Sequence, residues 1–194
     1  MTVEVRRALV LAGGHSSRMG CDKAALAING ESQLARTVRL AAAEVDRVQV
    51  SVRADQADDP LRAGYDCLVD APESAGPMAG ILTALKASAE PWLVLACDLP
   101  ALDATTLRHL LDNVAPDAPA TAYASERDGL PEPLCAVWMP AALGPLAEAL
   151  AAGRRCPRKL LIETGAPLLQ LPVAGALTNV NTPADLRELA GVNG

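Results

Sequence analysis

Short apolar runs alternate with longer amphipathic stretches along the chain. The apolar runs are rich in Val, Leu and Ile and predict strands at Arg7–Leu11, Arg47–Val52, Asp66–Val69, Trp92–Ala96, Thr121–Ala124, Leu134–Trp138 and Leu168–Leu171. The Ala- and Leu-rich stretches predict helices at Gln33–Ala43, Ala79–Ala87, Ala104–Asn113, Ala141–Ala152, Pro157–Thr164 and Pro183–Ala190. This alternation is typical of an α/β fold with a mainly parallel sheet.

Two of the predicted strands, Arg7–Leu11 and Trp92–Ala96, are apolar at almost every position. Strands of this kind are covered by helices on both faces of the sheet. We therefore expect a Rossmann-like domain of three layers. No repeat, low-complexity tract or long linker divides the sequence, so residues 1–194 are expected to form a single domain.

Composition narrows the possible partners. The net charge is −6, no dense run of Lys and Arg occurs, and aromatic residues make up only 2% of the chain, so we expect no nucleic-acid partner. No stretch approaches the ~18 apolar residues of a membrane span, and the first apolar run is too short for a signal peptide. The five scattered cysteines contain no C-x-x-C pair, which indicates free thiols and a cytoplasmic protein without a membrane partner.

The segment from Leu11 to Lys23 reads L-A-G-G-H-S-S-R-M-G-C-D-K and directly follows the first strand. Gly13 and Gly14 would let the backbone approach a ligand closely, and Arg18 and Lys23 supply two cations, so the segment indicates a polyphosphate site. The alternative is a tight turn with a solvated arginine and lysine. The spacing matches neither the P-loop nor the dinucleotide fingerprint.

Carboxylates follow two other predicted strands at the same edge of the sheet. Asp98 comes after the most apolar strand and Asp70 after the third. Ligands of open α/β sheets lie beyond these carboxyl ends, and a carboxylate there can hold Mg²⁺ together with substrate phosphates. Alternatively, Asp98 only hydrogen-bonds the turn ahead of Pro100, and Asp70 has the same two interpretations.

Two further motifs have both a structural and a functional interpretation. Gly76–Gly80, G-P-M-A-G, could bring backbone close to a base or sugar, or could simply lead into a helix. Thr182 and Pro183 are typical of a helix start, which leaves Asn179 and Asn181 free to bind a ligand or to form a turn.

Histidine is scarce, and this limits the chemistry. His15 and His109 are the only two histidines in the chain, so almost no histidine is available for a histidine metal site or a Ser-His-Asp triad. Catalysis would depend on Arg, Lys, Asp and a metal ion, which indicates phosphate transfer.

Taken together, the motifs resemble the molybdenum cofactor guanylyltransferase (MobA) family of nucleotidyltransferases. The matching pieces occur in family order and span nearly the whole chain: Leu11–Lys23, Val69–Asp70, Gly76–Gly80, Cys97–Pro100, Glu132–Trp138 and Asn179–Leu186.

The resemblance implies the nucleotide-diphospho-sugar transferase-like fold and transfer of GMP from GTP to molybdopterin-bound molybdenum. It implies that Leu11, Ala12, Gly13, Lys23, Asp70 and Asp98 bind the nucleotide, and that Asp98 holds Mg²⁺. Asn179 and Asn181 resemble the residues that bind the molybdopterin substrate. Molybdoenzymes or cofactor-delivery proteins would be further partners.

Two residues depart from the family pattern. Arg53 stands about where relatives often have an Asn that contacts the nucleotide, which leaves the choice of base open. Glu132 stands where relatives commonly have Gln or His, and adds a negative charge near an anionic substrate unless it faces away.

Two alternatives therefore remain. One is a nucleotidyltransferase that uses CTP, or that has a sugar phosphate as acceptor. The other is a non-catalytic nucleotide-binding module. An NAD-dependent dehydrogenase is disfavoured, because the first turn lacks G-x-G-x-x-G.

Overall fold

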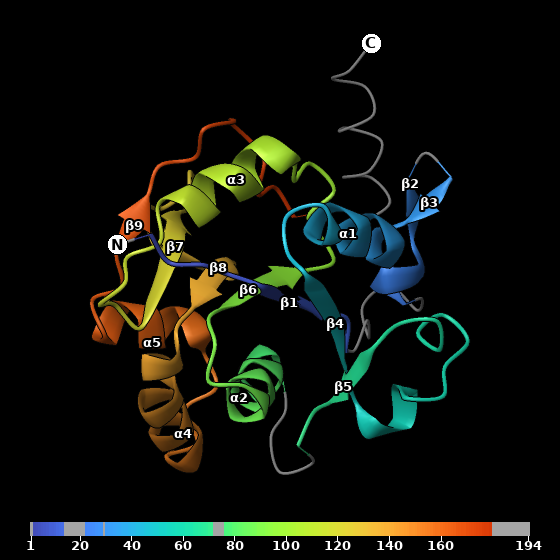
Figure 1. The fold of residues 1–194 in the computed structure, drawn as a ribbon, viewed down its shortest axis with the longest axis horizontal. Coiled ribbons are helices and arrows are strands. Elements are labelled where there is room, and N and C mark those ends of the chain that lie inside the picture. Colours follow the sequence, from blue (N-terminus) through green and yellow to red (C-terminus); the bar gives the residue numbers. More distant parts are fainter. Residues whose placement is uncertain (1, 14–21, 29, 72–75, 180–194) are drawn as a thin grey trace.

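Seven strands form one sheet in the order β5-β4-β1-β6-β8-β7-β9 (Figure 1). The computed structural model describes residues 2–13, 22–28, 30–71 and 76–179. The strands are β1 (Arg7–Leu11), β4 (Arg47–Val52), β5 (Cys67–Val69), β6 (Trp92–Ala96), β7 (Ala120–Ala124), β8 (Pro131–Trp138) and β9 (Leu168–Leu169). A separate hairpin contains β2 (Ala27–Ile28) and β3 (Glu31–Ser32).

The sheet is mainly parallel, as the sequence predicts. Within the described residues, β8 alone runs against its neighbours β6 and β7. In the parallel part Leu11 of β1 is level with Ser51 of β4 and with Ala96 of β6. The carboxyl ends of these three strands therefore meet at one edge of the sheet.

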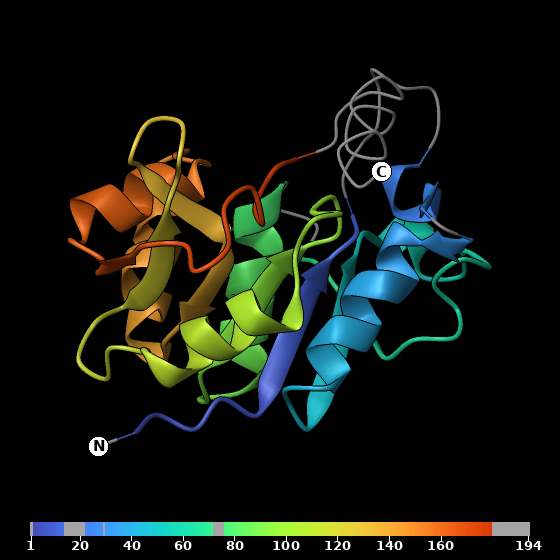
Figure 2. The ribbon, with the colours of Figure 1, turned by 90° about the horizontal axis from the view of Figure 1, so that it is seen from above.

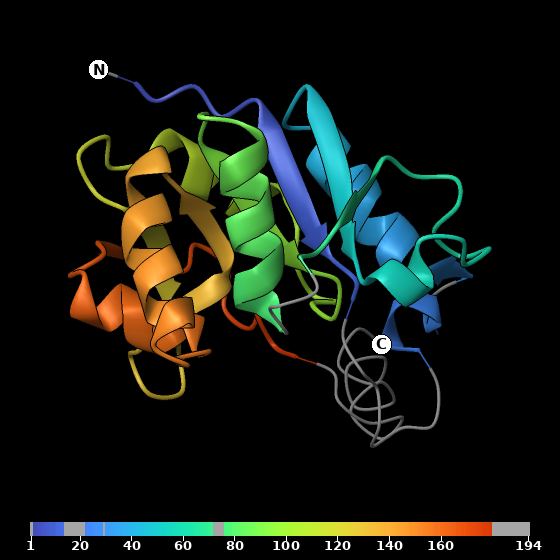
Figure 3. The ribbon, with the colours of Figure 1, turned by 90° about the horizontal axis from the view of Figure 1, so that it is seen from below.

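Helices cover both faces, giving the expected three layers. The helices are α1 (Gln33–Ala42), α2 (Pro77–Ala87), α3 (Ala104–Asp112), α4 (Leu143–Ala151) and α5 (Pro157–Glu163), with short 3-10 turns η1 (Lys23–Ala25), η2 (Ala54–Gln56) and η3 (Pro140–Ala142). Figure 2 shows α1 and α3 on one face, and Figure 3 shows α2, α4 and α5 on the other. The predicted helix Pro183–Ala190 lies outside the described residues.

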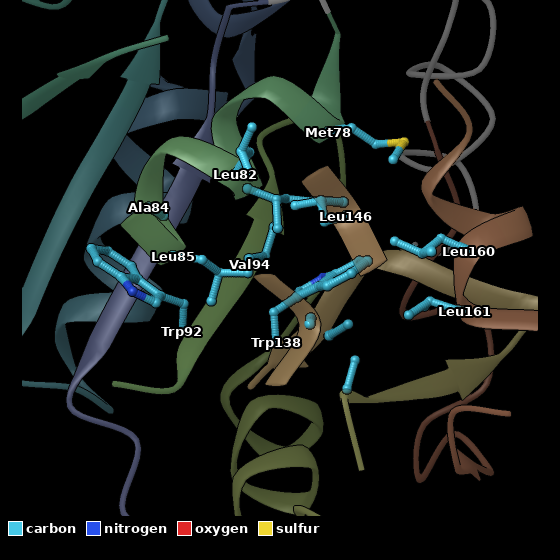
Figure 4. Packing of buried hydrophobic residues seen from close by; sticks show 14 of the residues in the cluster. Met78, Leu82, Ala84, Leu85, Trp92, Val94, Trp138, Leu146, Leu160 and Leu161 are labelled. Atoms are coloured by element: carbon cyan, nitrogen blue, oxygen red, sulfur yellow. The ribbon is translucent and has the colours of Figure 1, made fainter. Parts of the chain in front are cut away.

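The core is divided between the two faces by the alternation of side chains along the strands. In β1, Leu9 packs toward α2, whereas Ala8 and Val10 pack toward the face of α1. Figure 4 shows the larger cluster, where α2, α4 and α5 meet around Trp138. The Trp138 indole is fully buried and donates to the carbonyl of Pro133, at 3.1 Å, so its polar atom is satisfied.

Local signals explain where several helices begin. The Ser32 hydroxyl accepts from the amide of Ala35 at the start of α1, and Asp103 caps α3 in the same way. Helix α2 starts at Pro77, two residues earlier than expected, because Gly76 adopts φ +83° and Pro77 suits the first helical position. No helix among the described residues is both long enough and apolar enough to span a bilayer.

The strands differ from the sequence expectation mainly at β2-β3 and β8; in addition, β9 ends at Leu169 instead of Leu171, and β5 and β7 each start one residue away from the predicted position. The hairpin β2-β3 was not predicted, although Asn29-Gly30 is a typical hairpin dipeptide and Gly30 has φ +84°. Strand β8 begins at Pro131 instead of Leu134. Its first residues pair with β7 alone, while the pairing with β6 starts at Cys135, so Pro131 and Pro133 remove no hydrogen bond to β6.

Candidate functional site

The ends of β1 and β6 lie side by side and bring the first predicted residues together. Leu11 is the last residue of β1, and Ala12 and Gly13 follow it. Asp98 comes two residues after the end of β6, which is paired with β1 up to Ala96. The backbone of Ala12 and Gly13 therefore lies beside the strand end that carries Asp98.

Lys23 is the first residue of the turn η1, and its amine lies close to Asp98. The distance between Lys23 Nζ and Asp98 Oδ2 is 3.5 Å, and the two side chains are 27% and 24% exposed. A predicted cation and a predicted carboxylate are thus next to each other and accessible to a ligand.

The turn that follows Asp98 is held by an arginine of α1. Arg36 donates to the carbonyl of Leu102, at 2.6 Å, and more weakly to that of Leu99, at 3.4 Å. Partial burial lowers the pKa of Arg36, but the group stays protonated because an arginine titrates far above neutral pH. The position of Asp98 therefore depends on a contact between α1 and the turn.

Asp70 lies at the end of β5, where it is half-buried. Its backbone amide donates to the carbonyl of Val52, and its carboxylate accepts a 2.7 Å hydrogen bond from the Ser51 hydroxyl. Burial raises the pKa of Asp70, and the Ser51 hydrogen bond and the Arg53 charge oppose this effect. A Cβ placed on Gly13 would lie 3.7 Å from Asp70 Oδ2, so Asp70 and Gly13 are neighbours.

Arg53 follows β4 and reaches Leu11–Lys23, called here the glycine segment. Its guanidinium donates to the carbonyl of Gly13 and forms an ion pair with Asp55, with a shortest contact of 2.9 Å. The departure from the family pattern therefore lies at the edge of the candidate site.

Arg62 contacts the candidate site, and sequence reasoning missed it. The side chain is fully buried and forms ion pairs with Asp22 and Asp59, each at 2.6 Å. It also donates to the carbonyl of Ala12, at 2.7 Å. The residue stands in a polar stretch without periodicity, D-D-P-L-R, so no local pattern marks it as buried.

Cys97, which precedes Asp98, does not act as a nucleophile. Burial and the nearby carboxylates of Asp98 and Asp22 raise the pKa of the Cys97 thiol to about 12. The thiol is therefore neutral at physiological pH and packs as a small apolar side chain.

Gly80 serves the packing of α2 on the sheet. A Cβ at this position would lie 2.5 Å from Ser51 Oγ and 2.9 Å from Leu11 Cδ2. Any larger residue would push the helix away from β1 and β4. The second glycine of G-P-M-A-G thus allows a close helix–strand contact that supports Leu11 and the Ser51–Asp70 pair.

The charge of Glu132 is balanced locally. Arg158 of α5 lies 3.2 Å from Glu132 and 3.3 Å from Asp128. The additional carboxylate is therefore paired with a cation of the protein.

The other predicted residues lie at or beyond the end of a described range. Asn179 is exposed and lies at the end of the last described range. Gly14, Arg18 and Asn181 lie outside the described residues.

The donor set around Asp98 fits Mg²⁺ only in combination with a substrate. Among the described residues no group of three His, Cys, Asp or Glu side chains could hold a metal ion. Asp98 offers a partly exposed carboxylate, and Mg²⁺ is commonly bound by one or two carboxylates together with substrate phosphates and water. The site therefore fits a metal ion that arrives with a nucleotide.

Comparison with known proteins gives a consistent family assignment. Residues 8–168 match the model of the MobA-like NTP transferase domain. A probable molybdenum cofactor guanylyltransferase from Synechococcus elongatus is 38% identical over 190 residues, covering 94% of this chain and 96% of that protein. A molybdenum cofactor biosynthesis bifunctional protein from Synechocystis sp. is 35% identical over 182 residues, and the match spans 52% of its length.

The fold is shared with a solved structure of similar size. Molybdopterin-guanine dinucleotide biosynthesis protein A from Archaeoglobus fulgidus superposes with a TM-score of 0.78 at 21% sequence identity, over 96% of this chain and 98% of that one. At this identity the likeness establishes the three-layer fold.

Proposed function

The chain belongs to the MobA-like NTP transferase family, and we propose that it transfers GMP from GTP to molybdopterin-bound molybdenum, releasing pyrophosphate. The proposal is supported by the relatives of nearly equal length that are named molybdenum cofactor guanylyltransferase. The observation that carries it is the Lys23–Asp98 pair, 3.5 Å apart, beside the backbone of Ala12 and Gly13 at the end of β1.

The nucleophile in this reaction would be the terminal phosphate of the molybdopterin substrate. A phosphate monoester has a second pKa of about 6, so it is largely dianionic at pH 7 and needs no general base. One of its oxygens attacks the α-phosphorus of GTP, a new P–O bond forms, and the bond to the β-phosphate breaks. The scarcity of histidine is compatible with this chemistry.

The protein would contribute positioning and positive charge. We assign the backbone of Leu11, Ala12, Gly13 and Gly14 to nucleotide binding, with Asp70 completing that site. Lys23 and Arg18 would balance the charge that develops on the departing pyrophosphate. Asp98 would hold Mg²⁺, which supplies neutralisation and alignment of the phosphates when it is bound. Asn179 and Asn181 are assigned to the molybdopterin substrate.

Turnover of purified variants tests these assignments. Lys23→Ala and Asp98→Ala are each expected to lower the rate of pyrophosphate release by on the order of 10²–10³-fold, the loss typical of one well-placed charged group. Lys86→Ala, which removes a lysine of α2, serves as the matched control and should retain activity. A folded Asp98→Ala protein with near-normal turnover would contradict the mechanism.

A second candidate is a related nucleotidyltransferase with another base or acceptor, and Arg53 is the observation that favours it. Its guanidinium bonds the Gly13 carbonyl at the edge of the nucleotide site, where relatives often have Asn. Pyrophosphate release measured with GTP, ATP, CTP and UTP separates the bases, and replacing molybdopterin by sugar phosphates separates the acceptors. Nucleotide binding without any turnover would instead favour a non-catalytic module.

We propose further that the chain acts as one domain over residues 1–194 in the cytoplasm, with molybdoenzymes or cofactor-delivery proteins as partners. The described cysteines, Cys67, Cys97, Cys135 and Cys156, are free thiols, which supports a reducing compartment. Gel filtration of the protein mixed with an apo-molybdoenzyme tests the association.

A further inference from the structure

A buried arginine connects the two described ends of the glycine segment. Arg62 Nη2 donates both to the carbonyl of Ala12, at 2.7 Å, and to Asp22 Oδ2, at 2.6 Å. Ala12 directly follows β1, whereas Asp22 lies ten positions further along the chain. One guanidinium nitrogen thus fixes the distance between these two points of the backbone.

The energetics of the cluster indicate a role in positioning. Arg62 is 0% exposed, while its partners Asp22 and Asp59 are 31% and 34% exposed. Removing a cation completely from water is costly, and buried ion pairs commonly contribute little net stability compared with an apolar replacement. What an apolar residue could not supply is the geometry of a planar group that binds several acceptors in fixed directions.

Asp22 carries this restraint to Lys23. Its Oδ2 binds Arg62, and its Oδ1 accepts from the amide of Ala24, at 2.9 Å, capping the turn η1. Both carboxylate oxygens are thus engaged, and Lys23 is the next residue. A continuous chain of contacts runs from the end of β1 through Arg62 and Asp22 to Lys23, and from there to Asp98.

We infer that Arg62 is a positioning residue of the nucleotide site, which acts through Asp22 to hold the Lys23 amine beside Asp98. The inference rests on the proposed function for the role of Lys23, because it assigns the restrained amine to the phosphates of the nucleotide. The restraint on Lys23 itself can be measured without any substrate.

The second ion pair provides a matched control. Asp59 binds the other terminal nitrogen of Arg62, and its remaining oxygen accepts from the amide of Leu61, at 2.9 Å, away from η1. Asp22→Asn and Asp59→Asn each remove one charge next to Arg62 and retain a side chain of the same size. A purely structural ion cluster would respond equally to the two substitutions.

The first experiment measures Lys23 directly. The acetylation rate of its amine by a water-soluble anhydride is followed by mass spectrometry in the wild-type protein and in both variants. We expect Asp22→Asn to raise the rate several-fold, because the amine is no longer held beside Asp98, and Asp59→Asn to leave it unchanged. Equal rates in all three proteins would overturn the inference whatever the substrate is.

The second experiment relates the restraint to the nucleotide. In Asp22→Asn we expect kcat/KM for GTP to fall about tenfold, as for loss of a charged hydrogen bond, whereas Asp59→Asn stays within about twofold. The losses from Asp22→Asn and Lys23→Ala should be non-additive, because both act through one amine. Equal kinetic losses in Asp22→Asn and Asp59→Asn would overturn the inference.

The two failures can be distinguished. If the wild-type protein releases no pyrophosphate from GTP and the labelling rates still differ as expected, the proposed function is wrong and the restraint on Lys23 stands. Arg62→Met, which keeps the volume and removes the charge, should increase Lys23 labelling as Asp22→Asn does. A folded Arg62→Met protein with wild-type labelling would contradict the role of Arg62.

Discussion

Asp70 is a carboxylate whose charge is costly in the folded protein. Burial raises its pKa, while the Ser51 hydroxyl and the Arg53 guanidinium act in the opposite direction. Ionisable groups with perturbed pKa values are common at binding sites. Two substitutions therefore test how the surroundings of Asp70 set its pKa and how its charge affects the stability of the fold.

Removal of the Ser51 hydroxyl should raise the pKa of Asp70 further. Ser51→Ala deletes the 2.7 Å hydrogen bond that favours the ionised form. The pKa is measured from the pH titration of the Asp70 carboxyl carbon by NMR. Ser88→Ala, which removes a hydroxyl bound to Glu90, is the control and should leave that titration unchanged.

Neutralisation of Asp70 should stabilise the protein at neutral pH. The folded-state pKa is raised above the unfolded value, so the ionised carboxylate opposes folding at pH values above it. Asp70→Asn is expected to have a higher Tm than the wild type at pH 7, and the difference should shrink as the pH falls through the raised pKa. Asp117→Asn, at an exposed loop position, should show no such pH-dependent difference.

At the scale of single elements, α2 packs against the sheet with no room for a side chain at one position. The close approach occurs at Gly80, where a Cβ would contact Ser51 and Leu11. A glycine inside a helix costs about 0.5–1 kcal/mol relative to alanine, so its presence here reflects the need for space. The same contact supports Leu11 at the end of β1, where the glycine segment begins.

Gly80→Ala should therefore destabilise the fold by about 1–3 kcal/mol, the usual cost of overpacking. Gly144→Ala in α4 is the matched control, since nothing lies within 4 Å of its added Cβ, and it should stabilise the protein by about 0.5–1 kcal/mol. Urea denaturation measures both. A Gly80→Ala protein as stable as the wild type would show that α2 can move away from β1 without cost.

For the whole molecule, ligand binding and stability are linked by mass action. At a nucleotide concentration of about 100 times Kd, the folded state gains about 2.7 kcal/mol, which corresponds to a rise in Tm of roughly 5–11 °C for a chain of this size. We expect the largest rise with GTP and Mg²⁺ together. A larger rise with CTP would favour the cytidylyl alternative, and no rise with any nucleotide would contradict the phosphate site.

Much of the architecture could be predicted from the sequence, because the signals are local. Strands β1, β4 and β6 have the predicted bounds, since β1 and β6 are apolar runs and β4 alternates polar residues with valine. The contacts of Arg62 could not be predicted, because they join residues up to 50 positions apart and depend on a fold that local patterns do not describe. For the same reason, the sequence predicts Lys23 and Asp98 as site residues from their chemistry and position, but the 3.5 Å distance between their side chains follows only from the fold.

The antiparallel strand β8 divides the sheet into two parts. Every described residue assigned to the nucleotide, from Leu11 to Asp98, precedes that strand in the sequence and belongs to the β5-β4-β1-β6 half of the sheet. The part of the sheet that contains β7, β8 and β9 carries none of the described residues assigned to the nucleotide. Changes on the surface of β7, β8 and β9 could therefore exchange one acceptor for another, while the strand ends that bind the energy-supplying substrate stay the same.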